Sequence, residues 1–93
     1  MATTFNAELR LLPTVEGGRE TPLRSGYRSI ARLGDTEELW GVEITFAAPT
    51  MLAPGESAAV TLRAWADPQT PSSGTAIQVY EGARLVGTGT VRE

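Results

Sequence analysis

The stretch Phe5-Asn-Ala-Glu-Leu-Arg-Leu-Leu12 alternates apolar and polar side chains, and Pro13 follows it directly. Successive side chains of a β-strand point to opposite faces, so the apolar positions of this stretch share one face. These positions are Phe5, Ala7, Leu9 and Leu11. Proline donates no backbone hydrogen bond and is expected to end the strand. The stretch therefore predicts a half-buried β-strand with one face on an apolar core.

Five further stretches have strand character and are separated by turn residues. They are Tyr27–Leu33, Trp40–Phe46, Ser57–Trp65, Thr75–Tyr80 and Leu85–Val91. Pro54-Gly55 suits the centre of a type II turn, and the segment from Glu81 to Arg84 suits a hairpin connection. The segment from Thr14 to Gly26 is too rich in glycine and proline for a helix or a regular strand, and is expected to be a long loop. Six short strands without a helical pattern predict a closed or nearly closed antiparallel barrel, which leaves no unpaired strand edges.

The length and composition of the chain predict one small domain over residues 1–93. The chain has no cysteine, so its core must be held by apolar packing alone, and an oxidising compartment is not indicated. Its beginning carries neither a basic leader nor a long apolar run, which favours a cytoplasmic location and no membrane partner. Because the formal net charge is −3, we expect no DNA partner, and any contact with RNA must be local.

The missing residue types also argue against catalysis. The sequence contains no histidine, cysteine or lysine, so the commonest general base, the commonest metal ligand and most covalent nucleophiles are absent. The run from Gly82 to Gly89 superficially suggests a phosphate-binding loop, but such a loop requires a following helix and none is predicted. We therefore expect a chain without enzymatic activity, catalytic residues, cofactor or metal.

Four motifs together resemble the third domain of the elongation factor Tu family. They are Gly17-Gly-Arg-Glu-Thr-Pro22, Ser25-Gly-Tyr-Arg28, Met51-Leu-Ala-Pro-Gly-Glu56 and Glu81-Gly-Ala-Arg-Leu-Val-Gly-Thr-Gly89, in the family's order and at nearly its spacing. The resemblance extends from about Phe5 to Arg92. It implies a six-stranded antiparallel Greek-key β-barrel, a cytoplasmic location, and a stand-alone bacterial relative of this translation-factor domain without the GTPase domain or the second barrel.

The resemblance also implies two candidate surfaces. The family packs one face of this domain against its GTPase domain, and the matching positions here are Gly17, Gly18, Arg19, Gln78 and Tyr80. A tyrosine suits an interface because its large ring tolerates water at the hydroxyl end. We expect this face to bind a GTPase-domain protein, another translation factor or a second copy of the chain.

The second candidate surface is the one with which the family contacts the T-stem of tRNA. Its candidate RNA-binding residues here are Arg19, Arg28, Glu81, Gly82 and Arg84. Several family residues are replaced, since Ser29 and Ile30 stand for a proline and a glutamine, Leu39 falls near a threonine, and Tyr80 stands for an arginine. We therefore expect any tRNA binding to be weak. A degenerate domain without independent activity remains a third interpretation.

Overall fold

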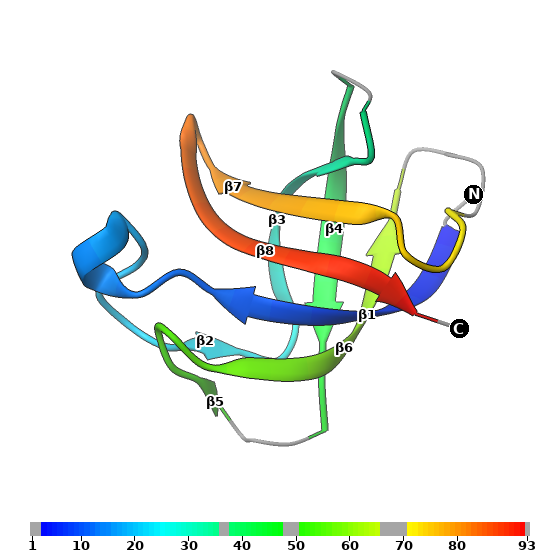
Figure 1. The fold of residues 1–93 in the computed structure, drawn as a ribbon. Coiled ribbons are helices and arrows are strands. Elements are labelled where there is room, and N and C mark those ends of the chain that lie inside the picture. Colours follow the sequence, from blue (N-terminus) through cyan, green and yellow to red (C-terminus); the bar gives the residue numbers. More distant parts are fainter. Residues whose placement is uncertain (1–2, 36–37, 48–50, 66–70, 93) are drawn as a thin grey trace.

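The computed structural model describes residues 3–35, 38–47, 51–65 and 71–92, and within these ranges the chain forms a closed barrel of six antiparallel strands (Figure 1). In barrel order the strands are β1 (Thr3–Leu11), β6 (Ser57–Ala64), β4 (Leu39–Thr45), β3 (Tyr27–Leu33), β7 (Ala76–Glu81) and β8 (Arg84–Arg92). Each predicted strand therefore corresponds to one barrel strand. The Greek-key assignment stays a prediction.

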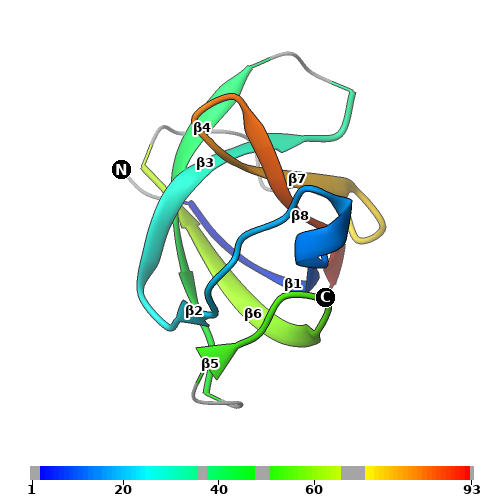
Figure 2. The ribbon, with the colours of Figure 1, turned by 90° about the vertical axis from the view of Figure 1, so that its left-hand side faces the viewer.

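Two very short strands and one helical turn were not predicted. They are the 3-10 turn η1 (Thr14–Glu16) and the strands β2 (Leu23–Arg24) and β5 (Met51–Leu52), of which η1 and β2 lie inside the expected long loop. Strands β2 and β5 pair with each other, with Leu23 opposite Leu52, and both leucines are buried. Figure 2 looks toward this end of the barrel, where η1, β2, β5 and the β7–β8 turn lie around the opening. The two leucines thus add apolar packing at this end.

The barrel interior follows the predicted alternation. Strand β1 buries Phe5, Ala7, Leu9 and Leu11, as the sequence predicts. Strands β4 and β6 contribute further buried residues at alternate positions, namely Val42, Ile44, Ala58, Val60, Leu62 and Ala64. Tyr27, Trp40 and Phe46 are partly buried and pack against this core. No polar or charged side chain is buried in the part of the chain that the structure describes, so the core depends on apolar packing.

Two local irregularities shape the strand ends. The turn before β6 is of the predicted type, because the Glu56 amide donates to the Ala53 carbonyl at 3.0 Å and Gly55 has φ 89°. Between β7 and β8, Val79 pairs with Gly87 and Tyr80 with Leu85. Val86 is therefore the extra residue of a β-bulge, and its buried side chain fills the core beside the hairpin.

Candidate functional site

A cluster of polar side chains joins the long loop to the β7–β8 hairpin. The guanidinium of Arg19 forms an ion pair with the Glu81 carboxylate and lies 5.0 Å from the centre of the Tyr27 ring. The Tyr27 hydroxyl donates a hydrogen bond to the same Glu81 carboxylate. Glu81 thus accepts from residues of the loop and of β3, and it fixes the position of the loop at this end of the barrel.

The same loop is held by a second contact from the hairpin. Arg84 Nη2 donates to the carbonyl of Gly18 at 3.1 Å. A β-carbon on Gly18 would collide with the Leu12 carbonyl, so the close approach at this position requires glycine. Gly17 ends η1 in the left-handed conformation with φ 92°. Gly18, Arg19, Tyr27, Glu81 and Arg84 together are called the loop cluster below.

The loop cluster unites several residues that were predicted for two different surfaces. Arg19, Glu81 and Arg84 lie together, with Gly82 in the adjoining hairpin turn, whereas Arg28 points elsewhere. A shallow depression of about 330 Å³ is lined by Arg19, Glu20, Thr21, Glu81 and Arg84. It carries two positive and two negative side chains, so it offers little net attraction for phosphate. Arg19 Nε also donates to the Thr21 carbonyl at 3.1 Å, so this side chain braces the loop.

A second group of residues lies on the outer face of the sheet at strands β3 and β7. Ile30 pairs with Tyr80 and Arg32 with Gln78, while Ala31, Leu33, Ile77 and Val79 point into the core. The Arg32 guanidinium lies 5.6 Å from the centre of the Tyr80 ring, and the Tyr80 hydroxyl bonds Gln78 Oε1 at 3.2 Å. Ile30, Arg32, Gln78 and Tyr80 are called the tyrosine face below.

Arg32 is the unusual member of the tyrosine face. Its Nε atom is inaccessible to solvent, and no hydrogen-bond acceptor is present for it among the described residues. A buried donor without an acceptor is unfavourable, by about 1 to 3 kcal/mol where the group is fully enclosed. The contact with the Tyr80 ring stabilises the positive charge but supplies no hydrogen bond.

A third group surrounds an exposed tryptophan at the end of β6. Trp65 is 40% exposed, and the guanidiniums of Arg28 and Arg63 lie 5.0 Å and 6.0 Å from its ring. Arg28 also approaches the Glu43 carboxylate at 3.8 Å. Arg28, Glu43, Arg63 and Trp65 are called the tryptophan face below. Trp65 thus packs across strands on the outer surface, beside arginines of β3 and β6.

Three important residues were absent from the predicted sites. Tyr27 and Arg32 lie on β3, and Trp65 directly follows β6. A signal for Arg32 exists in the alternation of β3, because Arg28, Ile30 and Arg32 must share the outer face once Ala31 and Leu33 are buried. The pairing of β3 with β7, which sets Arg32 beside Tyr80, depends on barrel topology and leaves no mark in either segment alone.

No protein-family model matches the chain. In the ranges that the structure describes, no group of three or more metal-ligating acidic, histidine or cysteine side chains is found. The same ranges contain no helix with the length and apolarity needed to span a membrane.

Proposed function

We propose that this chain is a non-catalytic protein-binding module related to the third domain of elongation factor Tu, and that it binds its partner through the tyrosine face. The observation that supports this proposal most directly is Arg32, a partly exposed arginine for which the described residues supply a ring contact with Tyr80 but no hydrogen bond or ion pair. Its Nε is enclosed, so a partner that presents carbonyl or carboxylate oxygens would have to bind the outer end of the guanidinium.

The composition of the tyrosine face supports the same proposal. Tyrosine and arginine are among the residues that dominate the binding energy of protein interfaces. Tyr80 offers a flat ring beside Ile30, and its hydroxyl is already oriented by Gln78. Tyr80 and Arg32 are fixed on strands of a closed barrel, so little conformational entropy is lost when a partner buries them.

The loop cluster has a supporting role in this proposal. The donors of Arg19 are largely satisfied within the chain by Glu81 and Thr21, and Arg84 gives one hydrogen bond to the Gly18 carbonyl. Glu81 follows Tyr80 directly on β7, and the cluster therefore stabilises the strand end that carries the tyrosine. Gly17, Gly18 and Arg19 would border the interface and hold its geometry.

The partner follows from the proposed relationship. A third-domain barrel of this family would bind the GTPase domain and second barrel of such a factor, and a second copy of the chain is the other candidate. The test is a calorimetric titration of the chain with a fragment of elongation factor Tu that contains only its first two domains. Light scattering of the chain alone over a concentration series tests self-association.

The decisive variant is Tyr80→Ala. Truncation of an interface anchor commonly costs about 2 kcal/mol, so we expect binding to weaken by roughly thirtyfold. Tyr80→Phe retains the ring and should bind within a few-fold of the wild type. Thr90→Ala, on the exposed part of β8, should have no effect. Absence of both self-association and fragment binding, or equal binding by Tyr80→Ala, would contradict the proposal.

RNA binding is the second candidate, and the tryptophan face favours it. Exposed aromatic rings that stand beside arginines are typical of surfaces on which unpaired bases stack. Trp65 with Arg28 and Arg63 provides such a surface, although Glu43 partly offsets its charge. Among the predicted RNA-binding residues, only Arg28 belongs to this face.

A further inference from the structure

Within the described ranges, strand β6 has a free edge at its beginning. Strand β1 accompanies β6 along its whole length, from Ala64 opposite Thr3 to Ser57 opposite Arg10. On the other side, β4 accompanies β6 only from Ala64 to Thr61, because β4 ends at Thr45. Among the described residues, the segment from Ser57 to Val60 therefore has a neighbouring strand on one side only.

The backbone of this free segment points its hydrogen-bonding groups toward the open side at alternate residues. The Trp65 amide donates to the Gly41 carbonyl of β4 at 3.0 Å, and the Thr61 carbonyl accepts from the Thr45 hydroxyl of β4 at 3.5 Å. In an antiparallel strand, residues two apart direct these groups to the same neighbour. Ala59 and Ser57 therefore direct theirs to the side from which β4 has departed.

The open side is not filled by the neighbouring described residues. A continued β4 would set Ala47 opposite Ala59, but Ala47 lies in a bend beyond the strand. Within the described ranges, no backbone hydrogen bond joins Ala59 to a residue on this side. Unpaired edges of this kind are templates for strand addition, and charged residues or prolines commonly protect them. The segment Ser57-Ala-Ala-Val60 contains neither.

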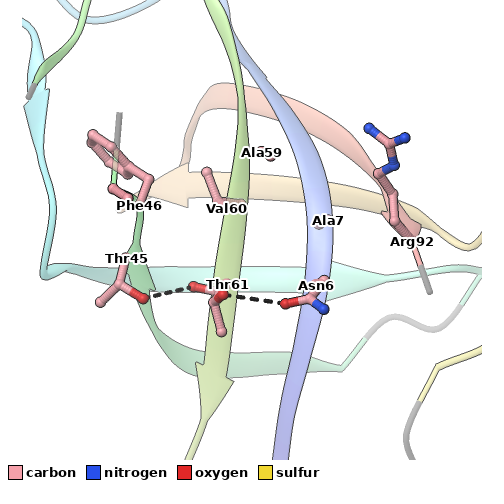
Figure 3. A pocket seen from close by; sticks show the side chains of 9 residues that line it. Asn6, Ala7, Thr45, Phe46, Ala59, Val60, Thr61 and Arg92 are labelled. Atoms are coloured by element: carbon pink, nitrogen blue, oxygen red, sulfur yellow. Dashed lines mark hydrogen bonds between the residues drawn. The ribbon is translucent and has the colours of Figure 1, made fainter. Parts of the chain in front are cut away.

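A hollow lies beside this edge (Figure 3). Its volume is about 540 Å³, and in the figure Phe46 and Arg92 stand on opposite sides of it, with Ala59 and Val60 between them. Thr45, Thr61 and Asn6 form a row joined by hydrogen bonds, in which the Thr61 hydroxyl donates to Asn6 Oδ1 at 3.2 Å. The small side chain of Ala59 keeps the surface around the edge low.

We propose that the free edge of β6 binds an extended peptide segment of a partner protein by strand addition. The segment pairs antiparallel with Ala59 and Ser57, and it takes the place that β4 would have taken had it continued. Side chains of the segment opposite Ala59 point outward, and those between them point toward Val60 and Phe46. The site therefore selects polar or β-branched residues at the peptide positions whose side chains point outward. It selects small apolar residues at the positions whose side chains point toward Val60 and Phe46.

An isolated extended segment fits this edge better than a second barrel does. The free edge covers only four residues and lies beside the Phe46 side chain. It therefore leaves room for one short extended segment, but less room for a strand that is flanked by the rest of a second barrel. The site shares no residue with the tyrosine face, and the inference is therefore independent of the proposed function. Pairing of this edge with a second copy of the chain would contradict the inference.

The probe is the capped peptide acetyl-Thr-Val-Thr-Val-Thr-amide, titrated into the ¹⁵N-labelled chain up to the millimolar range. We expect amide chemical-shift changes at Ser57, Ala59 and Thr61, and slower hydrogen exchange at the Ala59 amide when the peptide is present. N-methylation of the threonine amides, which face β6, should abolish binding. N-methylation of the valine amides, which face away, should leave binding within about threefold of the parent peptide.

A protein variant tests the same edge. Ala59→Pro removes one of the two amides that face the open side while leaving the hydrogen bonds to β1 in place, because proline is tolerated where its nitrogen faces away from a ladder. It should lose peptide binding at least tenfold, whereas Thr90→Ala should bind as the wild type does. If Ala59→Pro does not fold, the two N-methylated peptides decide the question without it.

Three results would overturn the inference. The first is an Ala59 amide that is already protected from exchange in the free chain at low concentration. The second is protection that rises with the concentration of the chain alone, which would assign the edge to a second copy. The third is equal binding of the two N-methylated peptides, or no shift at these residues with the parent peptide.

Discussion

Arg19 makes more polar contacts than a loop residue usually does. It pairs with Glu81, lies over the Tyr27 ring and bonds two atoms of Thr21. Its side chain is only 18% exposed and that of Glu81 is 31% exposed, so solvent screens the pair less than it screens a fully exposed one. The pair therefore stabilises the loop rather than serving as a free charged group.

Arg19→Ala should lower the free energy of unfolding by about 1 kcal/mol, since half-buried charged hydrogen bonds contribute on this scale. The effect should be coupled to Glu81→Ala, because each substitution removes the same ion pair. Urea unfolding of the two single variants and the double variant, followed by circular dichroism, measures the coupling. Arg10→Ala, on the exposed outer side of β1, is the control. Strictly additive effects of Arg19→Ala and Glu81→Ala would show that the pair contributes nothing to stability.

Two glycines of β8 allow a matched comparison. Gly87 and Gly89 pair with Leu11 and Leu9 of β1, and this strand lies close against both glycines. A β-carbon on Gly89 would collide with the Glu8 carbonyl and lie 3.2 Å from the Leu9 α-carbon. A β-carbon on Gly87 would lie 3.3 Å from the Arg10 carbonyl oxygen, where a small shift relieves the contact.

Gly89→Ala should therefore destabilise the barrel by about 2 kcal/mol or more, and Gly87→Ala by clearly less. Thermal unfolding of both variants measures the difference directly. Similar unfolding temperatures for the two variants would mean that β1 moves away from β8 with little loss of stability, which would contradict close packing of β1 against Gly89.

The sequence predicts several of the site residues but not the contacts between them. Arg19, Glu81 and Arg84 were all identified as candidate site residues from their motifs. Their mutual contacts were not predicted, because Arg19 and Glu81 are far apart in the chain and only barrel closure brings the loop to the hairpin. Trp65 was included in the predicted strand Ser57–Trp65, because alternation alone does not indicate that the strand ends at Ala64.

At the scale of elements, the outer faces of β3 and β6 carry the charges that decide between protein and RNA. Arg28 and Arg63 stand beside Trp65, while the chain as a whole is negative. Binding of tRNA should therefore be weak at physiological salt and should fall steeply as salt rises. The double variant Arg28→Ala and Arg63→Ala should reduce it further, whereas Arg84→Ala should change it little. Fluorescence anisotropy with labelled tRNA measures both effects, and submicromolar binding that distinguishes charged from uncharged tRNA would contradict this expectation.

The barrel strands were predictable because each has enough residues to display a period of two. Strands β2 and β5 have two residues each, which is too short for any period, and their pairing depends on where the long loop returns to the barrel. The bulge at Val86 could not be predicted from the sequence either, because an extra residue is recognised only when the register with β7 is known. The free edge of β6 likewise follows from where β4 ends, which the alternation of β4 overestimates by one residue at Phe46.

At the scale of the whole molecule, the chain is a small barrel whose interior is apolar and whose candidate functions lie on its outer faces. The tyrosine face, the tryptophan face and the free edge of β6 share no residue, so a partner that binds one of them should change the amide chemical shifts of a different set of residues. The loop cluster lies at the barrel end and holds the hairpin that carries Tyr80.

The central claim is that a protein partner binds the tyrosine face. The most direct test is amide chemical-shift mapping of the ¹⁵N-labelled chain during titration with the two-domain fragment of elongation factor Tu, and during concentration of the chain alone. The account predicts that the largest changes in one of these experiments cluster at Ile30, Arg32, Gln78 and Tyr80. Changes centred on Trp65 or Ala59 with these four residues unaffected, or no changes in either experiment, would contradict it.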